Sequence, residues 1–164
     1  MIEQIKIENF KCFPELTLPL AEMTVLAGAN ASGKSSIIQA LLLADGTMHN
    51  NGKMIDVSSV MKIAIGDPRT LISQEPKDME KGDFYIALKE RGQYRELFYY
   101  IDKLSPLKLL ADRAGDDLVS RVFYLNAERR GPRLSYPAKS DDEILKDGSN
   151  AAYLIDRADL EGRR

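Results

Sequence analysis

One stretch restricts what this chain can fold into more than any other feature. Residues 28–35 (GANASGKS) match the Walker A pattern G-x-x-x-x-G-K-[ST], in which a glycine-rich loop binds phosphate. Gly28 and Gly33 allow backbone conformations that a Cβ atom obstructs, so that successive N–H groups can point inward around an anion. This stretch therefore predicts an α/β fold of the P-loop NTPase class.

The loop needs a strand before it and a helix after it, and the flanking residues fit both. Residues 23–27 (MTVLA) are a short, mostly apolar run of strand length. Residues 36–44 predict a helix, whose positive end would add to the attraction for an anion. The apolar stripe of this helix consists of Ile37, Ile38, Leu41 and Leu42. A glycine-rich turn with a surface lysine is the alternative interpretation.

Two side chains of the loop have direct roles in phosphate chemistry. Lys34 can reach the β- and γ-phosphates as a point charge. The Ser35 hydroxyl can coordinate Mg²⁺, a hard cation that prefers oxygen, and it is the one metal ligand that we predict. The loop residues expected at the site are Gly28, Asn30, Ala31, Ser32, Gly33, Lys34, Ser35 and Ser36.

Composition and charge exclude several other classes of protein. The chain has 164 residues, of which 44% are hydrophobic and 29% charged, as in a soluble globular domain. Its formal net charge is −2, so the chain as a whole presents no basic field to nucleic acid or membrane. The single cysteine, Cys12, excludes an internal disulfide. With neither a signal peptide nor an apolar run of membrane-spanning length, we expect a cytoplasmic protein.

Alternating apolar and polar residues predict two antiparallel hairpins. In the first, residues 2–10 pair with residues 15–20. In the second, residues 84–88 pair with residues 97–102 around a turn at Gly92. We expect a mixed sheet in which the strand before the glycine-rich loop is central, with the first hairpin beside it and the second in an antiparallel part.

The other stretches have weaker patterns. Residues 45–59, which include a histidine expected to be solvated, and residues 74–82 predict loops. Residues 107–111 do not distinguish helix from strand, and residues 121–126 predict a buried strand. A basic stretch follows that strand and can contact a phosphate backbone or a partner protein, or can be solvated. Its arginines are Arg129, Arg130 and Arg133.

The first part of the chain resembles the opening of the SMC- and RecF-like ATPases, a group of ABC-type ATPases. The resemblance rests on residues 7–13 (IENFKCF), on Leu16 and Leu18, and on residues 25–36 (VLAGANASGKSS). In that group an I-x-N-F-[KR]-x-F strand precedes a G-x-N-x-[SA]-G-K-S loop. The spacing is most similar to the RecF- and OLD-like ATPases of prokaryotic DNA repair and phage defence.

The resemblance implies an ABC-type head that binds ATP and Mg²⁺. Asn30 would face the γ-phosphate, and Lys11 and Phe13 would approach the ribose or base. The second hairpin would belong to the antiparallel β-subdomain of such a head. A second lobe, a partner head, DNA and a nuclease are the partners that it implies. Asn126 or Glu128 would replace the glutamine that senses Mg²⁺ in this group.

Motifs that complete such a head are missing after Ser35. The paired acids at residues 116–117 and 141–143 do not follow an apolar strand, so neither is a Walker B motif, and no signature motif is found. Residues 147–155 resemble the entry to the helix that leads into the arm. We therefore expect residues 1–164 to be a single N-terminal lobe, truncated before these motifs, with little or no turnover by itself.

Two other functions stay open at this stage. A regulatory nucleotide-binding or DNA-binding module would bind nucleotide without hydrolysis, and a salt-sensitive interaction with DNA would identify it. A small P-loop kinase or GTPase would need a specificity motif, and the N-K-x-D motif is absent.

Overall fold

Six strands and one α-helix make up most of the described structure. The computed structural model describes residues 1–49, 54–57, 67–80, 82–101, 108–114 and 120–124. The chain divides into two compact units, Met1–Val122 and Phe123–Arg164, and all described helices and strands belong to the first. They are β1 (Ile2–Phe10), β2 (Phe13–Pro19), α1 (Lys34–Met48), β3 (Met54–Asp56), the 3₁₀ helix η1 (Pro68–Leu71), β4 (Phe84–Glu90), β5 (Gln93–Ile101) and β6 (Lys108–Ala114).

The six strands form one sheet in the order β2-β1-β4-β5-β6-β3, and every neighbouring pair is antiparallel. Both predicted hairpins are confirmed, because β2 pairs with β1 and β5 pairs with β4. The alternation of side chains sets the register between the two hairpins. Ile5 lies opposite Leu88 and Ile7 lies opposite Ile86, and all four side chains are fully buried.

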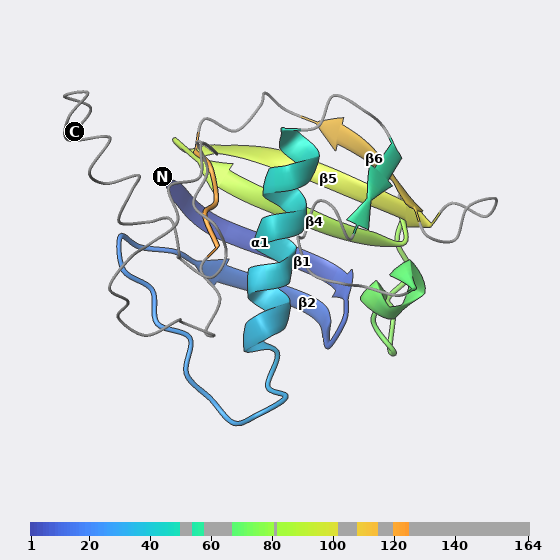
Figure 1. Cartoon of the computed structure of the whole chain (residues 1–164), viewed down its shortest axis with the longest axis horizontal. Helices are drawn as coiled ribbons and strands as arrows, with labels where there is room; N and C mark the ends of the chain where they lie inside the picture. The colour runs from blue at the N-terminus through green and yellow to red at the C-terminus, as the bar shows by residue number, and fades with distance from the viewer. Residues whose placement is uncertain (50–53, 58–66, 81, 102–107, 115–119, 125–164) are drawn as a thin grey trace, which may run out of the picture. The chain divides into compact units, whose positions relative to one another are not determined.

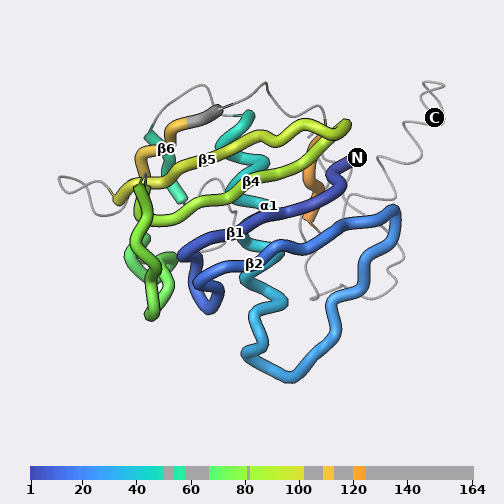
Figure 2. Tube along the Cα trace, turned by 180° about the vertical axis from the view of Figure 1, so that it is seen from behind, coloured from blue at the N-terminus to red at the C-terminus, as the bar shows by residue number. Residues whose placement is uncertain are grey.

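Helix α1 covers one face of this sheet, as Figures 1 and 2 show from opposite sides. Its buried side chains, among them Leu43, join the buried residues of β1, β4 and β5 in one apolar core. A polar contact crosses this core, because the Tyr99 hydroxyl lies 3.0 Å from the Thr47 hydroxyl of α1. The Phe84 ring stacks on Tyr99 with 4.6 Å between centroids. The helix is thus fixed on the sheet by burial and by one buried hydrogen bond.

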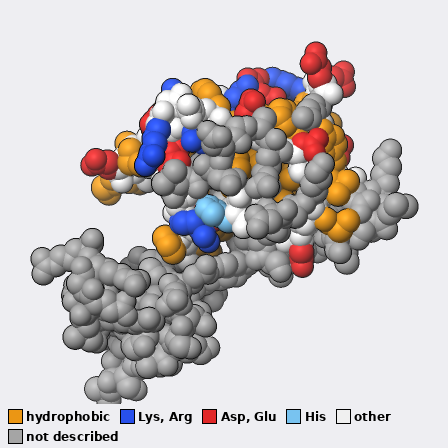
Figure 3. Space-filling view, turned by 90° about the horizontal axis from the view of Figure 1, so that it is seen from above, with side chains coloured by type: hydrophobic (Ala, Val, Ile, Leu, Met, Phe, Trp, Pro, Cys, Tyr) orange, Lys and Arg blue, Asp and Glu red, His pale blue; other side chains and the backbone are white. Residues whose placement is uncertain are grey.

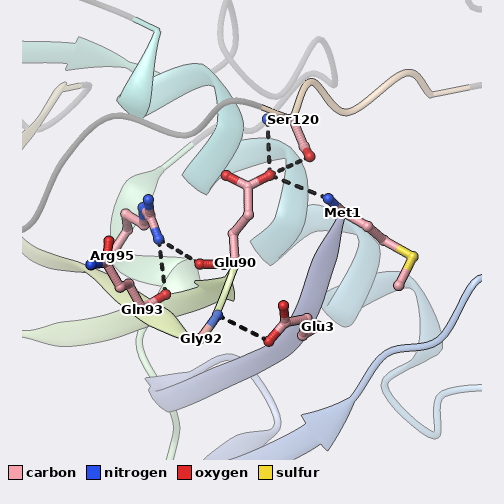
Figure 4. A network of polar contacts seen from close by, with 7 residues as sticks. All are labelled: Met1, Glu3, Glu90, Gly92, Gln93, Arg95 and Ser120. Atoms are coloured by element: carbon pink, nitrogen blue, oxygen red, sulfur yellow. Dashed lines mark hydrogen bonds and ion pairs between the residues drawn. The ribbon is translucent and has the colours of Figure 1, made fainter.

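A polar network around the buried Glu90 lies where β1 begins and the β4–β5 hairpin turns (Figure 4). Glu90, at the end of β4, is fully buried and accepts hydrogen bonds from the Met1 ammonium at 3.5 Å and from both the backbone and the hydroxyl of Ser120. Arg95 of β5 donates to the Glu90 carbonyl at 2.7 Å and to the Gln93 carbonyl at 3.0 Å. These contacts connect the start of β1 and the segment at Ser120 to the second hairpin.

The predicted strand before the glycine-rich loop is not formed. Residues 23–27 have no strand structure, and Met23 and Val25 are 82% and 72% exposed. The expected mixed sheet is therefore not observed in the described residues, where all strand pairs are antiparallel. The physical reason is that an isolated run of strand-forming residues is stable only with a neighbouring strand that takes up its hydrogen bonds.

Other helix and strand boundaries in the structure also differ from those predicted from the sequence. Helix α1 is longer than expected and runs to Met48, so that residues 45–48 are helical and not a loop. Residues 54–56 form the short strand β3, and the undecided stretch at 107–111 falls largely in strand β6. The predicted buried strand at 121–126 is wrong for its described part, because residues 121–124 are irregular and Phe123 is 63% exposed.

Several sequence predictions lie outside the described residues. They concern Asn126, Glu128, Arg129, Arg130, Arg133 and the helix expected at 147–155. Within the part that is described, no helix has the length and apolar character that a membrane crossing needs. The same residues contain no group of three or more histidine, cysteine or acidic side chains arranged to hold a metal ion.

Candidate functional site

The glycine-rich loop turns sharply where it enters α1. Gly28, Ala31 and Gly33 all have positive φ angles, of 156°, 63° and 89°. Left-handed residues among right-handed ones rotate successive backbone N–H groups toward one side, which creates a concave site for an anion. Ala31 carries a Cβ atom in a conformation that costs roughly 1–2 kcal/mol in an L-residue. The loop backbone is therefore strained at Ala31, whereas the glycines on either side adopt their positive φ angles without a steric cost.

Lys34 folds back over this loop. Its ammonium donates to the carbonyl oxygens of Gly28 at 2.8 Å and Ala29 at 2.5 Å, and to the Ser32 hydroxyl at 3.2 Å. All three acceptors belong to the loop, so the positive charge is held against the loop backbone at the surface. The Lys34 ammonium therefore lies beside the loop directly before the start of α1.

The first turn of α1 has no side-chain cap. Gly33 is the N-cap residue, no side chain accepts a hydrogen bond from the first turn, and no acidic residue lies there. The first backbone bond of the helix runs from Ile37 N–H to the Gly33 carbonyl at 3.1 Å. Uncapped N–H groups at a helix N-terminus attract an anion. The predicted ligands Ser35 and Ser36 lie in this turn, and Ser35 is exposed.

The turn between β1 and β2 packs directly on the glycine-rich loop. A Cβ atom on Gly33 would lie 2.5 Å from Phe13 Cζ and 2.7 Å from Cys12 Sγ, so this position requires glycine for space as well as for its φ angle. The Cys12 thiol also lies 3.9 Å from the Ser36 hydroxyl. The half-buried Phe13, which was expected near the ribose or base, thus lies against the loop itself.

Lys11 joins the same turn to α1. Its ammonium donates to Gln39 Oε1 at 2.5 Å, and its backbone N–H donates to the Leu71 carbonyl at 2.7 Å. Burial lowers the pKa of Lys11 below its usual range, because desolvation disfavours the charged form. The lysine is therefore fixed beside the loop.

A cavity of about 720 Å³ adjoins the loop at Ala31. Its size falls in the range of small-molecule sites. One wall comes from the β1–β2 turn, and the other comes from η1 and the segment after it. The residues of the second wall are Thr70, Ile72, Ser73, Gln74 and Glu75. Sequence analysis missed this wall because no periodicity marks it, and the turn signal before it indicates only a change of direction.

The predicted site residues are thus only partly brought together. The loop residues, Lys11 and Phe13 lie around the start of α1. Asn30 is exposed on the loop. The histidine of the chain lies apart, at the other end of the helix, where His49 Nδ1 is 3.3 Å from Asp45 Oδ1. It is paired rather than freely solvated.

Comparison with known proteins shows which family the sequence belongs to. Residues 1–127 match the family described as AAA ATPase domain. The chain is 35% identical over 46 residues to the OLD nuclease of Thermus scotoductus, a match that covers 28% of this chain and 9% of that protein.

Two chromosome partition proteins named Smc also match. The Methanocaldococcus jannaschii protein is 26% identical over 159 residues, which covers 79% of this chain and 14% of that protein. The Synechococcus protein is 47% identical over 57 residues, which covers 34% and 5%. The chain thus spans between 5% and 14% of the length of these relatives. The predicted similarity to SMC- and OLD-like ATPases is confirmed, and the chain belongs to the AAA ATPase domain family.

Proposed function

We propose that residues 28–36 bind Mg·ATP and that this chain is the first lobe of an ATP-hydrolysing head of the SMC/OLD-like type. The observation that carries the proposal is the position of the Lys34 ammonium, which lies among oxygen atoms of the loop directly before an uncapped helix. A cation beside an uncapped helix N-terminus complements the negative charge of a triphosphate.

The residues of the loop fit the phosphates and the metal in different ways. Lys34 would exchange its three loop acceptors for phosphate oxygens, because a charged acceptor makes the stronger hydrogen bond. The uncapped amides of the first turn of α1 would bind the remaining oxygens. Ser35, exposed in the same turn, would hold Mg²⁺, which neutralises phosphate charge when it is bound.

The cavity beside the loop would take the nucleoside part of the ligand. Ala31 and Lys11 line it, so Lys11 would lie beside the ribose or base. Phe13 has a different role in this proposal. Because its ring packs against the position that a Cβ atom on Gly33 would occupy, Phe13 would support the loop backbone at Gly33.

Further residues of a longer protein would complete the head. Met23 and Val25 are exposed apolar side chains in a segment that pairs with no described strand. A second lobe that adds a strand there would cover them, and a partner head would supply the groups that promote hydrolysis. A nuclease partner is proposed only from the name of one relative. On the face that Figure 3 shows, acidic and basic side chains are mixed, so this face offers DNA no uniformly basic surface.

Calorimetry with Mg·ATP on the purified chain tests the binding proposal. We expect Lys34→Ala to weaken the affinity by about 100-fold, since a charge-assisted contact to phosphate is lost. Lys6→Ala is the matched control, because Lys6 pairs with Glu8 on β1 and has no contact with the loop. Equal affinity in Lys34→Ala and the wild type would refute the proposal.

A phosphate-release assay on the same chain tests its place in the head. The loop supplies contacts to the ground state, but hydrolysis also needs a group that orients water and a second positive charge. We expect turnover far below the rate of about 1 per second that is ordinary for a working enzyme. Turnover near that rate, lost in Lys34→Ala, would show that the chain contains a complete active site.

A further inference from the structure

The penultimate residue of β1 has an unusual backbone and an unusual bonding pattern. Asn9 is 98% buried, with a relative exposure of 2%, and its φ angle is +56°. Asparagine tolerates this left-handed region better than most residues with a side chain. Its side-chain amide is used at both ends, since Nδ2 donates to the Lys77 carbonyl at 2.6 Å and Oδ1 accepts from the Lys77 N–H at 2.7 Å. One side chain thus forms the pair of bonds that a neighbouring strand would form.

The backbone around Asn9 continues this pairing along the segment after η1. The Ser73 N–H donates to the Asn9 carbonyl at 2.8 Å, and the Lys11 N–H donates to the Leu71 carbonyl at 2.7 Å. Phe10 and Ile72 form an isolated antiparallel bridge. On the surface, the Lys77 ammonium lies 2.6 Å from a carboxylate oxygen of Glu15 on β2. Residues 71–77 are therefore attached to the end of β1 through successive contacts.

This attached segment is one wall of the cavity beside the glycine-rich loop. Residues 72–75 line that wall, while Lys11 and Cys12, which follow Asn9 within three positions, line the opposite one. Asn9 lies two residues before the first wall, and its buried side chain bonds Lys77, which lies two residues after the second wall. Loss of these two side-chain bonds would release Lys77 and leave the second wall held by its backbone bonds to residues 9–11 alone, while the contacts described for the glycine-rich loop would stay the same.

We propose that Asn9 is a positioning residue that fixes residues 71–77 and thereby sets the affinity of the site for the nucleoside part of its ligand. The inference rests on the proposed function, because it takes the cavity to be the nucleoside subsite. Asn9 touches neither the loop carbonyls nor Lys34 in the contacts described, so its effect is confined to the cavity side. The affinity for a nucleotide would therefore depend on Asn9, and the affinity for an inorganic triphosphate would not.

The test compares Asn9→Gly with Gln4→Ala. Glycine keeps the positive φ angle and removes only the side-chain bonds. Gln4 is the control, because it lies on the same strand as Asn9, at the end away from the cavity. Its side-chain amide oxygen accepts a hydrogen bond from the Tyr94 hydroxyl of β5. Affinity is measured by calorimetry for Mg·ATP and for magnesium tripolyphosphate, and hydrogen exchange is followed at residues 71–77.

We expect Asn9→Gly to weaken the affinity for Mg·ATP by about tenfold. The affinity for tripolyphosphate should stay within about twofold of the wild-type value. The amides of Ser73 and Lys77 should exchange faster, and Gln4→Ala should change neither quantity. The inference is overturned if the affinities for both ligands fall together or if neither falls. Unchanged hydrogen exchange at residues 71–77 would overturn it as well.

A second variant covers the case in which Asn9→Gly does not fold. Asn9→Asp retains the acceptor for the Lys77 N–H and loses the donor, so its Mg·ATP affinity should lie between the wild type and the loss expected for glycine. Wild-type affinity in Asn9→Asp, with unchanged exchange at Lys77, would contradict the inference. A wild-type chain that binds neither ligand would refute the proposed function itself, and the nucleoside role of Asn9 with it.

Discussion

The sheet with its helix and the glycine-rich loop are held in place in different ways. In the sheet, apolar side chains such as Ile7 and Leu88 are fully buried, and each strand has hydrogen-bonded neighbours. The loop and the segment before it expose Met23 and Val25, and they rest on the fold chiefly where Gly33 meets Phe13. Burial therefore determines the scaffold, whereas backbone conformation and a few polar contacts determine the site.

This difference predicts that stability and ligand affinity respond to separate sets of residues. Core substitutions should lower the free energy of unfolding with little change in the affinity of the molecules that stay folded. Loop substitutions should lower the affinity with little change in stability.

The largest expected effect is in the core. Ile7→Ala removes a fully buried side chain opposite Ile86, and we expect it to lower the free energy of unfolding by about 3–4 kcal/mol because a cavity remains. Thr17→Ala, at an exposed position of the neighbouring strand β2, is the control and should change it by about 0.5 kcal/mol or less. Denaturant titration measures both. Equal losses in the two variants would contradict the burial argument.

A smaller effect, on affinity, is expected in the loop. Gly33→Ala forces a Cβ atom toward Phe13 and Cys12. We expect it to weaken the affinity for Mg·ATP by about 30-fold, or about 2 kcal/mol. Gly92→Ala is a matched control, because Gly92 also has a positive φ angle, of 74°, but no atom lies within 4 Å of the added Cβ. Both variants introduce backbone strain, but only Gly33→Ala should bind Mg·ATP more weakly.

An intermediate effect on stability tests the bond that joins helix and sheet. Tyr99→Phe removes the buried hydroxyl that bonds Thr47, and we expect a loss of about 1 kcal/mol at neutral pH. Burial raises the pKa of Tyr99 above its usual range, so the folded state holds this proton more tightly than the unfolded state. Stability should therefore fall as the pH rises above about 10 in the wild type.

In Tyr99→Phe that alkaline loss should be smaller, although the raised pKa of Tyr85 leaves a part of it. Denaturant titrations at several alkaline pH values measure the slope. Identical slopes in the two proteins would contradict the assignment to Tyr99.

The smallest effect is expected at the exposed apolar segment. Val25→Ser should change the free energy of unfolding of this chain by about 0.5 kcal/mol or less, because the side chain is 72% exposed. In a longer protein that covers this segment, the same substitution should be clearly destabilising. Thermal unfolding of both forms measures the difference. A large loss in the chain alone would mean that the segment is packed in solution.

Local patterns were sufficient for the hairpins and for the helix after the loop. Alternation in β1, β4 and β5 requires only neighbouring residues, and a one-residue shift would expose Ile5 and Ile7. The strand predicted at 23–27 failed for the opposite reason. Its apolar residues fit a strand, but a strand also needs a partner, and no pattern in residues 23–27 reveals whether one is present.

The sequence by itself determined the chemistry of the loop: which residues carry the positive charge, the hydroxyl groups and the glycines, and how they are spaced along the chain. Only the tertiary structure decided what lies next to them. It brings the segment after η1 beside the β1–β2 turn through Asn9, and it places Phe13 and Cys12 beneath Gly33. Spacing along the chain reports local conformation, whereas these contacts join residues far apart in sequence and depend on how the whole sheet pairs.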